Sequence, residues 1–252
     1  MLIKDDSPLR RLPTNLNPKQ AQFCDGVRFS AEMADLAYQQ LSDYLLPLSA
    51  SKPNVARISA VGPFLFAWSI IDSAHRLHGL VSNFPNLARK NQSPEFRNFV
   101  EKAESVEKLR NAVQHMDSTI HTSAEAGHVV WGTLTWISPT IRGTIYTCLL
   151  VPGAMMPGAT YTPINPAGLA IKPPLDHITL KAFNVSVNLT DVMDALAKLV
   201  GALEKGLTDA FEAFPDRAGS DMWIALEGHP GPNNSWTIPA QGPGQQTVSS
   251  QK

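Results

Sequence analysis

The sequence predicts a mainly α-helical domain in which a small antiparallel sheet is inserted before the last of four helices. Apolar residues recur at helical spacing over three segments in the first half of the chain and again over residues 190–214. At about 128–188 the pattern changes to short runs rich in β-branched and aromatic residues. Strands and helices do not alternate along the chain, which argues against a doubly wound α/β sheet.

Length and composition favour one domain between two tails. The chain has 252 residues, of which 43% are hydrophobic, enough for a sizeable core. Residues 1–29 carry three prolines and little periodicity, so we expect an N-terminal tail there. Residues 215–252 are rich in Pro, Gly and Gln and are expected to form a C-terminal tail, because this composition cannot build a core. The helical domain is therefore expected over residues 30–214.

The first two helices are predicted from their boundaries and apolar faces. The first begins at Ser30, an N-cap candidate, and ends before Pro47, because proline does not continue a regular helix. The second covers about 55–81 and is almost wholly apolar through its middle, as in a helix surrounded by others. Gly62-Pro63 is expected to kink this helix or to mark its true start.

The third helix has the clearest start. Ser93, Pro94 and Glu95 supply an N-cap, a proline at the first helical position and an acid in the first turn. Apolar residues then recur at a seven-residue spacing that is typical of helical bundles, and the helix is expected to end near Thr122.

Three strand candidates and a final helix follow. The strands are expected at 128–137, 140–151 and 177–187, and the first two form a hairpin. A Thr-Asp pair then caps the last helix, which runs over 190–214 with one apolar face.

The charge balance excludes a protein that binds nucleic acid through a broadly basic surface. The chain has 21 Lys+Arg against 22 Asp+Glu, a formal net charge of −1. Only 17% of the residues are charged, and this low proportion indicates extra buried area such as a subunit interface. The N-terminus lacks the apolar segment of a signal peptide, and no apolar run is long enough to span a bilayer. We therefore expect a cytoplasmic protein with no membrane partner.

The sequence also lacks the usual signatures of metals and cofactors. Two cysteines, Cys24 and Cys148, are too few for a disulfide framework or a four-ligand zinc site, so reduced thiols are expected. There is no glycine-rich phosphate loop and no H-E-x-x-H, and the closely spaced histidines lack carboxylate partners. We therefore expect neither a metal nor another cofactor.

One polar segment stands out near the end of the third predicted helix: Arg110-Asn111, with His115 four residues after the asparagine. Arg-Asn-x-x-x-His, late in a bundle of four helices, resembles the motif of the HEPN superfamily, the higher eukaryote and prokaryote nucleotide-binding domains. The resemblance covers residues 30–122 and 190–214, with the strands as an insertion before the last helix. It implies a HEPN-like four-helix bundle that works as a homodimer, with the two motifs facing each other. Many members cleave RNA without a metal ion, whereas others only bind nucleotides or partner proteins.

The activity that the resemblance implies is that of a metal-independent endoribonuclease, such as a toxin or defence factor, and these residue types can carry it out. The imidazole of His115 can take a proton from a ribose 2′-hydroxyl, or give one to the leaving 5′-oxygen, near neutral pH. The Arg110 guanidinium can hold the phosphate through two hydrogen bonds and stabilise its developing charge. Asn111 can donate to the phosphate or orient the imidazole. RNA is therefore the partner that the resemblance implies.

Helix geometry, however, separates the two charged groups of the motif. At about 100° per residue, Arg110 and His115 lie about 140° apart around one regular helix. A cleft shared by two copies of this helix, or a break after Asn111, would bring them together. The alternative interpretation is a solvated helix end in a non-catalytic helical module that binds a protein or nucleotide partner.

A second polar group lies in the later half of the second predicted helix. Asp72, His75 and Arg76 share one helix face at i, i+3, i+4 spacing. If that face borders the third helix, Asp72 would hold Arg110, and His75 or Arg76 would contact a substrate phosphate. The alternative is an internal Asp72–Arg76 ion pair at a polar helix end, which contributes little to stability.

Overall fold

The computed structural model describes residues 1–50, 59–83, 93–115, 129, 131–140, 143–153, 161–214, 217–219, 221, 223, 229–230 and 236–237. The chain divides into two compact units, Met1–Ala218 and Gly219–Lys252. In the described part of the second unit, β7 (His229–Pro230) pairs with β8 (Trp236–Thr237) in antiparallel fashion. The remaining paragraphs concern the first unit.

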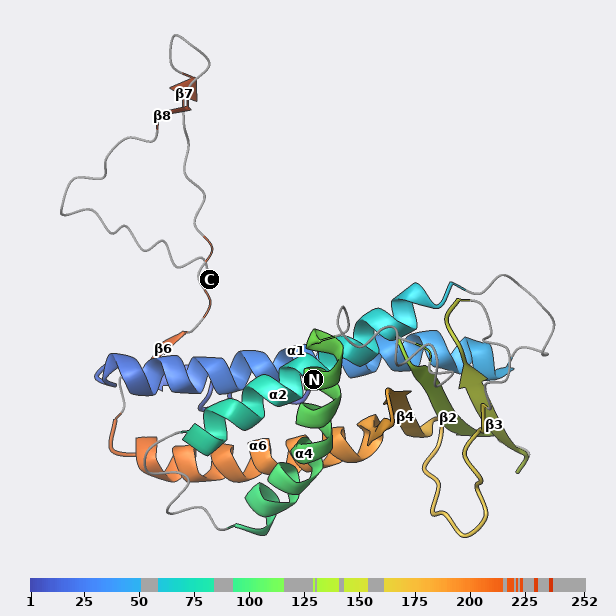
Figure 1. The fold of residues 1–252 in the computed structure, drawn as a ribbon. Helices are drawn as coiled ribbons and strands as arrows, with labels where there is room; N and C mark the ends of the chain where they lie inside the picture. Colours follow the sequence, from blue (N-terminus) through green and yellow to red (C-terminus); the bar gives the residue numbers. More distant parts are fainter. Residues whose placement is uncertain are drawn as a thin grey trace. The chain divides into compact units, whose positions relative to one another are not determined.

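Helices dominate the described part of the first unit, as expected from the apolar periodicity (Figure 1). The helices are α1 (Pro18–Ala50), α2 (Val61–Asn83), α4 (Pro94–Gln114) and α6 (Leu189–Phe211). The main sheet consists of β2 (Thr133–Pro139), β3 (Ile145–Leu150), β4 (Asp176–Ala182) and β5 (Val185–Asn188). A short pair is formed by β1 (Arg11–Pro13) and β6 (Arg217–Gly219). The prediction of a mainly α fold with a small antiparallel sheet before the last helix is therefore confirmed.

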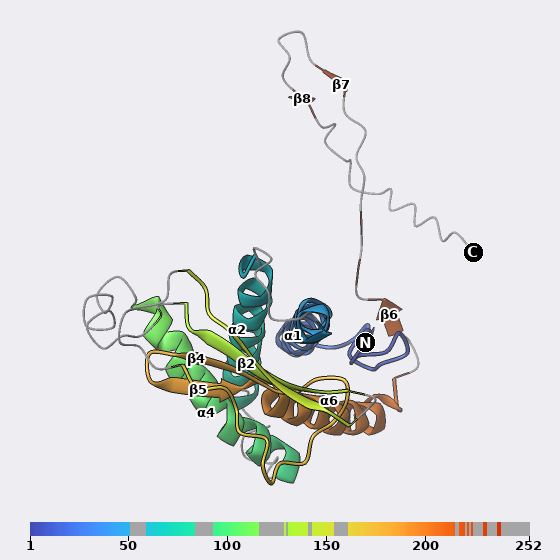
Figure 2. The ribbon, with the colours of Figure 1, turned by 90° about the vertical axis from the view of Figure 1, so that its right-hand side faces the viewer.

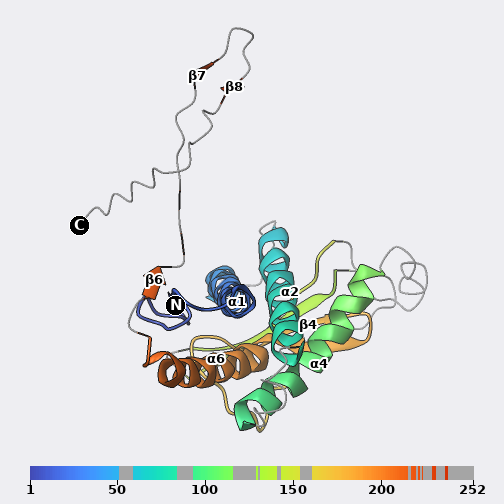
Figure 3. The ribbon, with the colours of Figure 1, turned by 90° about the vertical axis from the view of Figure 1, so that its left-hand side faces the viewer.

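Helix α2 lies at the centre of the helical layer. It packs against α1 on one side and α4 on the other, while α6 contacts α4, α1 and β4 (Figures 2 and 3). Helices α1 and α2 run antiparallel, since Leu80 packs on Gly26 and Tyr44 packs on Gly62. In the apolar middle of α2, Ile70 is fully inaccessible to solvent, but Leu65 is 58% exposed, so the prediction of a helix surrounded by others is only partly correct. This arrangement positions the later half of α2 directly beside α4.

The first 29 residues are not a tail, and the predicted domain boundary at residue 30 is wrong. Helix α1 begins at Pro18, a residue type that suits the first turn because its missing N–H has no partner there. Ile3 and Leu9 have exposures of 0% and 1% and belong to the main core. The Ser7 hydroxyl donates to the Glu204 carboxylate of α6, 2.5 Å away. Isolated apolar residues between prolines have no periodicity, so only the folded chain shows that they are buried.

Two helix boundaries next to prolines also differ in part from the predictions. Helix α1 continues through Pro47 to Ala50, so the predicted stop at Pro47 is wrong. Its last turn is held by the Ser49 hydroxyl, which donates to the carbonyl of Leu45 and accepts from Trp136 Nε1 of β2. Helix α2 begins at Val61, so Gly62-Pro63 marks its start, as one of the two alternatives stated. Residues 55–58 of that prediction lie outside the described residues.

Helix α4 begins as predicted. The Ser93 hydroxyl accepts a hydrogen bond from the backbone N–H of Phe96 at 3.2 Å, and Pro94 and Glu95 occupy the first turn. The helix ends at Gln114, with His115 as its C-cap, rather than near residue 122. Residues 116–128 lie outside the described residues.

The sheet has the order β3-β2-β4-β5, with all neighbours antiparallel. The predicted hairpin of the first two strands is confirmed, but the predicted third strand is itself a hairpin, β4–β5. Phe183 and Asn184 form its two-residue turn, with φ of 54° and 93°. Positive φ at both positions gives the turn a twist that matches the right-handed twist of the two strands. The N-cap of α6 is Asn188, whose side chain accepts from the N–H of Asp191 at 3.1 Å.

No helix in the described ranges combines the length and apolarity needed to cross a membrane.

Candidate functional site

The candidate site is centred on an ion pair that joins α2 to α4. Arg110 Nε donates to Asp72 Oδ1 at 3.2 Å. The Arg110 side chain is 27% exposed and the Asp72 side chain 53%, so the pair sits at the surface between the two helices. This is the contact that was expected if the later half of α2 borders the third predicted helix, and Asp72 pairs with Arg110 rather than with Arg76.

The position of Arg110 follows from the core-facing residues of its own helix. Phe99, Ala103, Val106 and Leu109 are the buried residues of α4. Arg110 follows Leu109 directly, so it lies at the edge of the buried face and reaches α2 along the surface. The bond to Asp72 uses Nε alone, and within the described part of the chain both terminal nitrogens of Arg110 remain available for another acceptor. A guanidinium held in this way can present two parallel donors to a phosphate.

His75 lies one turn after Asp72 on α2 and is electrostatically coupled to Arg110. Its Nδ1 is buried and has no hydrogen-bond partner among the residues that the structure describes. Burial lowers the pKa of His75 below its usual value, and the positive charge of Arg110 lowers it further. Both causes disfavour the protonated ring. His75 is therefore a neutral imidazole near neutral pH, placed beside a fixed guanidinium.

The other two motif residues face solvent. Asn111 is exposed on α4, and His115 is exposed at the C-cap, where its backbone N–H donates to the carbonyl of Val113. Helix α4 is continuous to Gln114, so the break after Asn111, one of the two alternatives for bringing the groups together, is not observed. Within one chain Arg110 therefore points to α2 while His115 lies at the exposed helix end. A cleft shared with a second copy stays a prediction.

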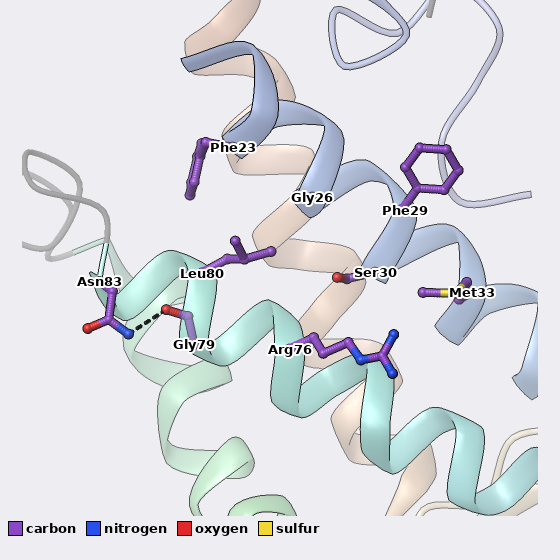
Figure 4. A pocket seen from close by; sticks show the side chains of 9 residues that line it. All are labelled: Phe23, Gly26, Phe29, Ser30, Met33, Arg76, Gly79, Leu80 and Asn83. Atoms are coloured by element: carbon purple, nitrogen blue, oxygen red, sulfur yellow. Dashed lines mark hydrogen bonds between the residues drawn. The ribbon is translucent and has the colours of Figure 1, made fainter. Parts of the chain in front are cut away.

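Arg76 is separated from the ion pair and lies over a different surface. It lines an open groove of about 630 Å³ between α1 and α2, as Figure 4 shows. Phe29 and Met33 of α1 line this groove, and so do Gly26 and Gly79, which have no side chains to fill it. Of the three α2 residues predicted to bind substrate, Asp72 and His75 thus lie with Arg110, whereas Arg76 extends toward α1.

Sequence reasoning missed the exposed apolar side chains beside this groove. Helical spacing predicts one apolar face that includes Met33, Leu36, Ala37, Leu41 and Leu45. The last three are buried as predicted, whereas Met33 and Leu36 are 40% and 60% exposed. Ala31 and Ala34 complete the buried stripe of α1. Apolar residues that cover more of a helix than one core-facing stripe are the sequence signal for a second apolar surface.

The described residues include no group of three or more His, Cys, Asp or Glu side chains that could hold a metal ion. Both cysteines are free thiols, Cys24 buried and Cys148 half-buried. Burial, and after it the charge of Asp25, raises the pKa of Cys24 to about 11, which suppresses its thiolate near neutral pH. Neither thiol is thereby marked as a nucleophile.

The chain has no match among protein-family models, curated proteins or solved structures. Its function is therefore inferred from the site itself. The site has the Arg110 guanidinium of α4, which Asp72 of α2 orients, the His75 imidazole of α2 beside it, and the His115 imidazole at the end of α4.

Proposed function

We propose that the protein is a HEPN-like, metal-independent endoribonuclease, such as a toxin or defence factor, that acts as a homodimer. The observation that carries the proposal is the Asp72–Arg110 ion pair. It orients a guanidinium, whose terminal nitrogens have no partner among the described residues, beside a neutral imidazole. Orienting such a group before the substrate arrives reduces the cost of binding a phosphate in the reactive geometry.

The proposed reaction is transesterification at the ribose 2′-hydroxyl. The neutral imidazole of His75 accepts the 2′-hydroxyl proton, and the 2′-oxygen attacks the phosphorus atom. The bond between phosphorus and the 5′-oxygen breaks, and protonated His115 donates a proton to that leaving oxygen. Arg110 holds the non-bridging oxygens, and Asn111 donates a further hydrogen bond. The products are a 2′,3′-cyclic phosphate and a 5′-hydroxyl end.

A second copy of the chain completes the proposed site. Because α4 is a regular helix through Asn111, His115 of one copy is better placed to meet Arg110 of another than Arg110 of its own chain. The low content of charged residues, 17%, and the exposed apolar side chains of α1 and α2 support a subunit interface.

The test is cleavage of a mixed-sequence RNA by the purified protein in EDTA, with the fragment ends analysed for 2′,3′-cyclic phosphate. We expect His115→Ala and Arg110→Ala to abolish cleavage. Arg97→Ala is the matched control, because Arg97 is an exposed arginine on the same helix outside the motif. Cleavage at the wild-type rate by either motif variant would end the assignment.

The groove between α1 and α2 favours a second candidate function, a non-catalytic module that binds a protein partner. Large exposed apolar side chains beside a groove are typical of surfaces that receive a helix. This candidate predicts that the wild-type protein leaves RNA intact. It also predicts that a photo-crosslinking residue in place of Leu36 labels one defined partner in cells, whereas the same residue in place of Leu169 does not.

A further inference from the structure

A second pocket, remote in sequence from the motif, opens on the outer face of the main sheet. Its volume is about 220 Å³, and its floor consists of residues from β2, β4 and β5. Side chains alternate between the two faces of each strand. Leu134, Ile178, Leu180 and Val187 are buried toward the core. The intervening side chains line the pocket and are almost all polar: Thr133, Thr135, Thr179, Lys181 and Ser186.

The strand register brings these polar side chains together. Thr133 pairs with Lys181, Thr135 pairs with Thr179, and Lys181 also pairs with Ser186 on its other side. Residues directly opposite each other in antiparallel strands have Cβ atoms about 4.5–5.5 Å apart. The base of the Lys181 side chain is therefore flanked by hydroxyl-bearing residues on both neighbouring strands.

Two of these groups lack partners in the part of the chain that the structure describes. Thr135 is only 8% exposed and is a lining residue of the pocket, yet its hydroxyl makes no hydrogen bond to the described residues. The Lys181 ammonium makes no ion pair there. Neither donor is therefore occupied by another described residue, and both can bond to a ligand that enters the pocket.

The charge of the lining selects the kind of ligand. Lys181 is the one charged side chain among the described lining residues, and no carboxylate lies among them. A lysine among hydroxyl donors suits an oxyanion, because the oxygens accept from every group present and the charge is balanced. Tyr161, Ile164 and Phe183 supply apolar surface for the remainder of a small molecule.

We propose that this pocket binds a small molecule through an oxyanion group, a phosphate or a carboxylate, held by Lys181 and the hydroxyl of Thr135. The site uses none of the residues assigned to RNA cleavage, so it is a separate function of the sheet insertion.

The test is an NMR titration of the full-length protein with inorganic phosphate, with acetate and, as a neutral control, with glucose. We expect saturable shifts of Thr135 and Lys181 resonances with at least one of the two anions. Saturation by phosphate alone assigns a phosphate ligand, and saturation by acetate alone assigns a carboxylate ligand. Saturation by glucose to the same extent, or by neither anion, overturns the proposal.

Two variants complete the test. Lys181→Met is expected to weaken anion binding by at least about tenfold, and Thr135→Val, which keeps the shape of the side chain, is expected to weaken it by a smaller factor. Lys108→Met, an exposed lysine on α4, is the matched control. Unchanged affinity in Lys181→Met, with an unchanged melting temperature, would show an adventitious ion only and overturn the site. RNA cleavage should be the same in all three variants, so the two proposals fail independently.

Discussion

The burial of the N-terminal segment leads to a quantitative prediction about Leu9. This side chain is 1% exposed and belongs to the main core, so truncation to alanine removes buried methyl groups and leaves a cavity. Such Leu→Ala changes cost about 2–5 kcal/mol. The free energy of unfolding of a domain is typically about 5–15 kcal/mol, so Leu9→Ala removes a large fraction of the stability.

Urea denaturation measures this loss. With a slope of about 2 kcal/mol per molar urea, the expected loss lowers the unfolding midpoint by about 1–2.5 M. Trp136 reports the transition, because its indole is 2% exposed in the folded chain and becomes solvated on unfolding. Protein concentration is held constant so that any self-association affects all variants equally.

Leu169→Ala is the matched control for this experiment. Leu169 is the same residue type and is 40% exposed, so its truncation should change stability by less than about 1 kcal/mol. If the midpoints of Leu9→Ala and Leu169→Ala coincide, the first residues of the chain are not part of the core, and the reasoning from burial is refuted.

Three further predictions concern the backbone, a thiol and an imidazole. Gly132 has φ of +84°, and a Cβ there would lie 2.5 Å from the carbonyl oxygen of Lys181. Gly143 has a similar φ, but a Cβ at this position would have open space around it. Gly132→Ala should therefore lower the melting temperature more than Gly143→Ala. With a pKa of about 11, Cys24 should resist alkylation at pH 8 in the folded protein and react on unfolding, as mass spectrometry will show; rapid native labelling would contradict its burial. The pKa of His75 is lowered by burial and then by the nearby guanidinium, so the unfolded chain binds the extra proton first. Stability should therefore fall as pH drops through 6.5 toward the lowered pKa, and His75→Gln should flatten that part of the profile; an unchanged profile would refute the shift.

Features that depend on neighbouring residues could be predicted from the sequence. The Ser93 cap, the helices after it and the first hairpin all depend on backbone preferences and on hydrogen bonds between residues a few positions apart. The i, i+3 spacing of Asp72 and His75 likewise placed both on one face of α2. Their contact with Arg110 could be stated only as a condition, since the sequence does not specify which helix borders that face.

Features that depend on distant residues were decided by the tertiary structure. Ile3 and Leu9 are buried in a segment that is tied to α1 by the bond from Leu2 to Asp35 and to α6 by the bond from Ser7 to Glu204. Helix α1 continues past Pro47 into a turn where Ser49 accepts a hydrogen bond from Trp136 of β2. The hydroxyls around Lys181 meet because three strands pair in one register. Local preference is a property of a short segment, whereas burial and register are free energies of the whole chain, so they are settled only when all the elements have packed.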